Sequence, residues 1–91
     1  MNQNELNKRA EELIDRVRES IGINKETFDG YIIWRKRIYR CAILAQQMVV
    51  EEKEDKLEFA VAWCGSDVRI KECRKELIEA QSLLTILKDK L

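Results

Sequence analysis

The pattern of hydrophobic and polar residues predicts three helices, of which the middle one is the longest. In the first, over residues 4–20, apolar side chains recur at intervals of three and four and form one stripe. Asn2, with Glu5 three positions later, is typical of a helix N-cap. Gly22 is suited to end this helix because glycine adopts a left-handed conformation without a Cβ penalty.

The second predicted helix covers residues 25–63 and is hydrophobic over more than half of its circumference. This sector is wider than the ~100° stripe of an ordinary surface helix. Such a helix has to be covered on two sides, so we expect it to be the central element of the fold. The acidic run at 51–56 contains no glycine or proline, and we therefore predict that the helix continues through it, straight or gently kinked.

Two interpretations compete at the start of this helix. Asn24 could cap a helix that begins at Lys25. Asp29-Gly30, between two aromatic residues, is also a hairpin signal, but no convincing partner strand precedes it. We therefore favour a helix here. At the other end, the alternation over residues 57–63 also fits a strand, which is the minor alternative.

The last predicted helix, over residues 67–90, follows the turn signal Cys64-Gly65-Ser66. Its apolar residues alternate steps of three and four for three heptads, which is typical of a coiled-coil seam. We predict an antiparallel three-helix bundle in a single domain, residues 1–91, whose leftover apolar surface is completed by dimerisation. The residues expected to mediate self-association are Ile43, Val50, Leu57, Leu84 and Leu87.

The composition favours the all-α class. The 91 residues include no proline and only three glycines, and 37% are charged. The turn formers that sheets and long loops need are therefore scarce. The N-terminal residues 1–12 are polar, and no apolar run reaches the ~18–20 residues that span a bilayer, so we expect a cytoplasmic protein that does not bind membranes.

Charge is balanced over the chain but separated along the predicted central helix. There are 17 basic and 17 acidic residues, which argues against a dedicated nucleic-acid binder. Residues 31–50 carry four basic residues and no acidic one, whereas 51–58 carry five acidic and two basic residues, a net −3. In an antiparallel homodimer each basic half would lie beside the partner's acidic half. The predicted contact residues for a protein partner are Arg35, Lys36, Arg37 and Arg40.

The same basic segment allows an alternative function, the binding of nucleic acid. Arginine and lysine would bind phosphates, and Trp34 or Tyr39 could stack on bases. On a helical wheel, though, both aromatic residues fall on the apolar side, away from Lys36, Arg37 and Arg40. We therefore prefer an exposed basic surface behind buried aromatic residues.

One set of acidic residues resembles a catalytic motif. Glu51, Glu52 and Asp55, followed by Glu76 and Glu79, resemble the EExxE…ExxD pattern of the all-α MazG-type nucleotide pyrophosphohydrolases, with Asp55 and Glu79 departing from it. The resemblance implies carboxylates on two antiparallel helices that hold Mg²⁺ for triphosphate cleavage. Solvated helix faces explain the same residues in a charge-rich chain, and we prefer that interpretation.

The remaining chemistry-bearing residues point to no active site. Three cysteines without a CxxC pair, in a chain without histidine, exclude a Cys/His metal site and are predicted to be small buried thiols. Trp63-Cys64-Gly65 has the WxG form found in the turn of secreted helical hairpins, but we predict that Trp63 anchors the core. We expect a non-enzymatic protein–protein interaction module without a cofactor. By analogy, such a module serves as an accessory, regulatory or inhibitory subunit, including phage-encoded ones.

Overall fold

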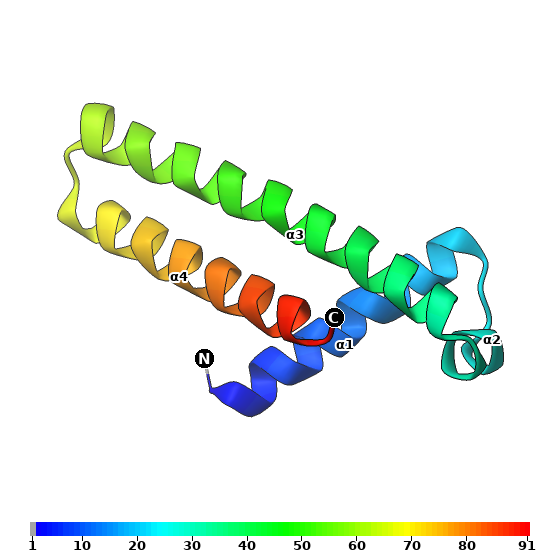
Figure 1. Ribbon diagram of the computed structural model, residues 1–91. Coiled ribbons are helices and arrows are strands. Elements are labelled where there is room, and N and C mark those ends of the chain that lie inside the picture. The colour runs from blue at the N-terminus through cyan, green and yellow to red at the C-terminus, as the bar shows by residue number, and fades with distance from the viewer. Residues whose placement is uncertain (1) are drawn as a thin grey trace.

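The computed structural model describes residues 2–91 and contains helices but no strand within this range (Figure 1). In chain order the elements are α1 (Gln3–Ile21), α2 (Lys25–Gly30), α3 (Ile32–Phe59), a short π-helical segment η1 (Ala60–Cys64) and α4 (Asp67–Asp89). The all-α prediction is confirmed, and the alternative of a strand over residues 57–63 is wrong.

Helices α3 and α4 form a long antiparallel hairpin, which α1 crosses obliquely near its open end (Figure 1). The molecule is elongated, with extents of 51 × 23 × 18 Å. The turn end of the hairpin, around η1, extends away from α1 and consists of α3 and α4 alone (Figure 1). The predicted three-helix bundle is therefore only partly present, because two helices pack lengthwise and the third covers part of their length.

The ends of α1 lie where the sequence predicts them. Oδ1 of Asn2 accepts a 2.9 Å hydrogen bond from the backbone N–H of Glu5, which satisfies a donor that the first helical turn leaves free. At the other end Gly22 has φ +87°, and its N–H donates to the carbonyl of Arg18. The Arg18 guanidinium also donates to the carbonyl oxygen of Ile23 over 2.9 Å. These hydrogen bonds fix the direction in which the chain leaves α1.

The helix predicted over residues 25–63 is divided in two. Asn24 caps α2 as predicted, because its Oδ1 accepts a 2.8 Å hydrogen bond from the N–H of Thr27. The backbone is then extended at Tyr31, with φ −127° and ψ 112°, and α3 begins at Ile32. A single continuous helix from residue 25 is therefore wrong, whereas the preference for a helix over a hairpin at this position is confirmed.

Helix α3 continues without a break through the acidic run at 51–56, as predicted. No helix breaker occurs there, and the charged side chains are mostly exposed. Lys53 turns to α4, where its Nζ lies 3.2 Å from Oε2 of Glu76. This ion pair joins the two helices beside the start of α1, whose Leu6 and Arg9 line the same pocket.

The core lies where α1 crosses the hairpin. Six buried residues from α1, α3 and α4 form one cluster there: Ala10, Ile14, Ile38, Ala42, Ile43 and Leu87. Ile38 and Leu87 are the largest of the fully buried side chains. Ala10 and Ala42 are also fully buried, and their small size allows the crossing helices to approach closely.

The turn between α3 and α4 depends on Gly65. Its φ of +62° lies in the left-handed region, and its N–H donates to the carbonyl oxygen of Ala60 over 3.2 Å. Trp63, just before it, is 78% exposed. The prediction that Trp63 anchors the core is wrong because the hairpin has no third helix at this end to cover the indole.

We expect Gly65→Ala and Gly30→Ala to change stability in opposite directions. A β-carbon added at either glycine would meet no neighbouring atom within 4 Å, so the backbone conformation decides the outcome. Alanine at Gly65 would have to remain left-handed, which costs roughly 1–2 kcal/mol. Gly30 has no positive φ, so alanine there should stabilise the protein by roughly 0.4–1 kcal/mol. Urea unfolding measures both changes, and changes of the same sign would contradict the turn geometry.

Candidate interaction surface

The residues predicted to mediate self-association lie inside the chain's own fold. Ile43, Val50 and Leu87 are buried, and Leu57 and Leu84 are half-buried. They are covered because α4 packs along this side of α3 and α1 crosses it. The monomer already uses these residues, so a surface for self-association has to consist of others.

A continuous surface of α3 is covered by no other helix within residues 2–91. Leu44 and Met48, near the middle of α3, are 61% and 70% exposed. Other exposed residues occupy the same arc of about 100° on the helical wheel, on the side opposite the buried Gln46, and Cys41 and Glu58 lie at the two edges of this arc. Figure 1 shows α4 running along one side of α3 while the other side faces outward. We call this surface the outer face of α3: Ile33, Arg37, Arg40, Leu44, Met48, Glu51, Asp55 and Phe59.

Charges on the outer face are ordered by sign. Arg37 and Arg40 lie in its N-terminal half and Glu51 and Asp55 in its C-terminal half, with two apolar residues between them. All four charged residues are exposed. Within residues 2–91 the ion pairs involve Arg18 and Lys53 instead, so these four charges have no ion-pair partner in the described chain.

Of the four basic residues predicted to bind a partner, three are exposed and one is half-buried. Lys36, Arg37 and Arg40 are exposed, and Arg37 lies over the half-buried ring of Trp34, with Cζ 5.4 Å from the ring centroid. Arg35 is half-buried and lines a 250 Å³ cavity beside the C-terminus of α4. Three of the four are therefore available to a partner.

The aromatic residues are poorly placed to stack on nucleic-acid bases. The ring of Tyr39 packs edge-on against Phe28, with centroids 5.8 Å apart. Trp34 is half-buried beneath Arg37. The Tyr39 ring thus contributes to internal packing, and the Trp34 ring is partly covered by Arg37.

The carboxylates of the MazG-like pattern are not assembled into a metal site. Glu51, Glu52 and Asp55 are exposed on α3, and Glu76 on α4 pairs with Lys53. In the part of the chain that the structure describes, no three histidine, cysteine, aspartate or glutamate side chains are grouped so that they could hold a metal ion. These carboxylates therefore do not form the metal site that the resemblance implies.

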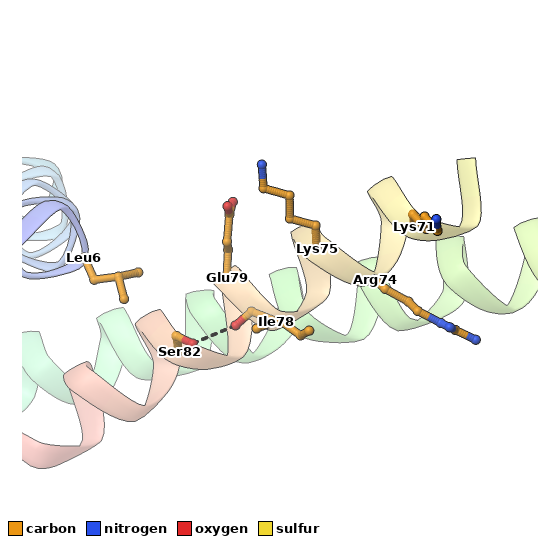
Figure 2. A pocket seen from close by; sticks show the side chains of 7 residues that line it. All are labelled: Leu6, Lys71, Arg74, Lys75, Ile78, Glu79 and Ser82. Atoms are coloured by element: carbon orange, nitrogen blue, oxygen red, sulfur yellow. Dashed lines mark hydrogen bonds between the residues drawn. The ribbon is translucent and has the colours of Figure 1, made fainter. Parts of the chain in front are cut away.

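A cavity of 360 Å³ lies on α4 beside the start of α1 (Figure 2). The Ser82 hydroxyl in its wall is used within α4, where it donates to the carbonyl oxygen of Ile78 over 2.8 Å. Figure 2 shows Lys75 and Arg74 pointing in different directions rather than toward a common point. The charged groups of the cavity thus do not all point to one place, although Lys75 and Glu79 extend from the same side of α4 (Figure 2). Its lining consists of Leu6, Lys71, Arg74, Lys75, Ile78, Glu79 and Ser82.

Two of the three cysteines are exposed. Cys41 lies on α3 beside the outer face and Cys64 lies in η1, while Cys73 on α4 is buried. The prediction of buried thiols is therefore right for Cys73 alone. The other two are exposed because neither this side of α3 nor the turn end of the hairpin is covered by another helix.

The outer face of α3 is the candidate site because Leu44 and Met48 form an exposed apolar pair at its centre, with Ile33 and Phe59 exposed at its ends. Single exposed apolar residues are normal on protein surfaces, whereas contiguous ones indicate an interaction. No helix within residues 2–91 combines the length and the apolar character that crossing a membrane requires. Comparison of the chain with protein families, with characterised proteins and with solved structures finds no match.

Proposed function

We propose that this protein is a non-enzymatic protein–protein interaction module that binds through the outer face of α3, with a second copy of the chain as its first partner. The exposure of Leu44 and Met48, one turn apart at the centre of this face, carries the proposal. Each apolar side chain that a partner covers stabilises a complex by about 25 cal/mol per Å² of area removed from water. Flanking charges of both signs would restrict which partner fits.

The chemistry available on this face agrees with a binding role. Its exposed groups are aliphatic, thioether, aromatic, guanidinium and carboxylate side chains, which can make apolar contacts and ion pairs with a partner. A protein of this kind acts as an accessory, regulatory or inhibitory subunit, since it contributes a surface to an assembly.

Nucleic-acid binding by the basic half is the alternative, supported by the exposure of Lys36, Arg37 and Arg40. Lysine and arginine at such positions bind phosphates. The acidic residues over 51–58 continue the same helix and would repel a phosphate backbone that followed it. A short basic segment with an acidic continuation fits a protein partner better than a polyanion.

Site-specific cross-linking in cells tests the proposal for any protein partner. A photo-reactive amino acid in place of Met48 should give one or a few discrete products larger than the chain, because this side chain lies at the centre of the proposed contact. The matched control is the same amino acid in place of Gln81, which is exposed on α4 outside the outer face. Circular dichroism of both variants checks that they fold.

The proposal is contradicted if illumination gives no discrete product at position 48, or if the products at 48 and 81 are the same. Mass spectrometry of the product then identifies whether the partner is a second copy or a different protein.

A further inference from the structure

The residues of the outer face follow an order that suits one particular partner. The face begins and ends with apolar side chains, Ile33 and Phe59, and has a further apolar pair at its centre. Basic residues occupy the zone before this centre and acidic residues the zone after it. The order is therefore apolar, basic, apolar, acidic, apolar.

This order is symmetric about residue 46. Leu44 and Met48 lie two positions on either side of it, and Arg37 and Asp55 lie nine positions on either side. With a rise of 1.5 Å per residue, the two charged residues are each about 14 Å from the centre along the helix. A two-fold axis perpendicular to α3 at this point would place Arg37 of one copy opposite Asp55 of the other.

From this symmetry we infer that two copies of the chain pair antiparallel through the outer face of α3, about a two-fold axis near residue 46. The inference rests on the proposed function and gives the orientation and register of the second copy. Leu44 of each copy then contacts Met48 of the other at the centre. Arg37 and Asp55 form an ion pair on each side of the axis, so each charge that lacks an ion-pair partner within residues 2–91 gains one between chains.

The flanks of the face support the same register. Arg40 and Glu51 lie on one flank of the helical wheel, and Trp34 and Phe59 lie on the other. A two-fold axis brings equal flanks of the two helices together. It therefore pairs Arg40 with Glu51 and Trp34 with Phe59, each within one residue of the symmetric position.

A parallel pairing does not fit these residues. In parallel register Arg37 would face Arg37 and Asp55 would face Asp55, and like charges across an interface are unfavourable. A different protein would need a surface with the complementary order of charged and apolar residues. A second copy of the chain, placed antiparallel, already presents this order. The observations therefore favour a second copy.

The size of the contact sets the strength that we expect. Helix α3 has 28 residues, which corresponds to about 42 Å of helix. One face of a single helix gives an interface near the lower end of the roughly 1,200–2,000 Å² that specific complexes bury. We therefore expect a dimer at micromolar concentrations that dissociates on dilution and at high salt.

Sedimentation equilibrium with charge exchange tests the register. The wild-type protein should approach twice the 10.8 kDa mass of one chain. Arg37→Asp and Asp55→Arg should each raise the dissociation constant roughly tenfold or more, since each creates two like-charge contacts per dimer. The double variant Arg37→Asp/Asp55→Arg restores both ion pairs and should return the dissociation constant to nearly the wild-type value.

The matched control is Arg74→Asp, which makes the same exchange at an exposed position on α4 and should leave the dimer unchanged. A parallel dimer would respond differently, because neither exchange alters its number of like-charge contacts. A double variant that stays as weak as the single variants overturns the antiparallel register.

Cys41 gives an independent measure of orientation, in a Cys64→Ser background that removes the other exposed thiol. In the antiparallel register the two Cys41 residues are separated by about 15 Å along the helices, too far for a disulfide. Adding Glu52→Cys places a thiol on the same flank as Cys41 and within one residue of the symmetric position, so mild oxidation should then give a covalent dimer. A covalent dimer through Cys41 without this substitution overturns the register.

The failure of this inference can be told apart from the failure of the proposed function. A wild-type chain that stays monomeric at all concentrations, but cross-links from position 48 to a different protein, overturns the homodimer and leaves the interaction module standing. A monomer that gives no discrete cross-link overturns both.

Discussion

Replacement of Ile38 by alanine should lower the free energy of unfolding by roughly 2–5 kcal/mol. Ile38 is 0% exposed and lies in the core where α1 crosses the hairpin. The substitution removes apolar contacts and leaves a cavity that three packed helices can close only in part. Since small domains have a total stability of roughly 5–15 kcal/mol, this loss is large enough to bring the protein close to unfolding at room temperature.

The matched control is Ile33→Ala, the same chemical change one and a half turns away in the same helix. Ile33 is 65% exposed, so the substitution should change stability by less than about 0.5 kcal/mol in a solution dilute enough to dissociate the proposed dimer. Urea unfolding followed by circular dichroism gives both values. Equal losses at the two positions would show that the core does not lie where α1 crosses α3.

Replacement of Ala42 by leucine should also destabilise the protein, by roughly 1–3 kcal/mol, although it adds apolar volume. Ala42 is fully buried and belongs to the same core cluster as Ala10 of α1. A larger side chain at this position has no empty space to occupy, so α1 has to shift or the leucine has to adopt a strained rotamer. The cost therefore measures how closely α1 packs against α3.

Ala45→Leu is the control for this experiment, because Ala45 is exposed on the same helix. Alanine and leucine are both strong helix formers, so we expect a change of less than about 0.5 kcal/mol. Thermal unfolding of the two variants makes the comparison. If leucine is tolerated equally well at both positions, then α1 does not pack closely at this crossing.

The antiparallel pairing that we propose would also explain the apolar residues exposed at both ends of α3. Ile33 is 65% exposed near its start and Phe59 is 59% exposed at its end, both on the outer face. In an antiparallel dimer the start of α3 in one copy lies beside its end in the other. Residues that a single chain leaves in water would thus be brought together in two places.

The sequence by itself determined which segments are helical and where most of them end. Asn2, Asn24 and Ser66 cap their helices through side-chain oxygens that accept a backbone N–H three residues later. Gly22 and Gly65 end helices with a positive φ. These features depend on residues close together in the chain, which is why they can be predicted without knowledge of the fold.

The break at Tyr31 was not predictable in the same way. Its extended backbone needs no glycine or proline, and Gly30 remains inside α2. Phe28 of α2 packs edge-on against Tyr39 of α3, a contact that requires the chain to turn between the two helices. Tertiary packing therefore divided a segment whose local pattern suits one continuous helix.

Only the tertiary structure decided which side of α3 is covered. The helical wheel shows an apolar sector wider than one neighbour can bury, but it contains no information on where the neighbour lies. Helix α4 meets the side of Gln46, whose Nε2 donates to the carbonyl oxygen of Ala80 over 3.0 Å. Ile43 and Val50 are therefore buried while Leu44 and Met48 remain exposed. Contacts between residues far apart in the chain set this choice, and local periodicity does not encode them.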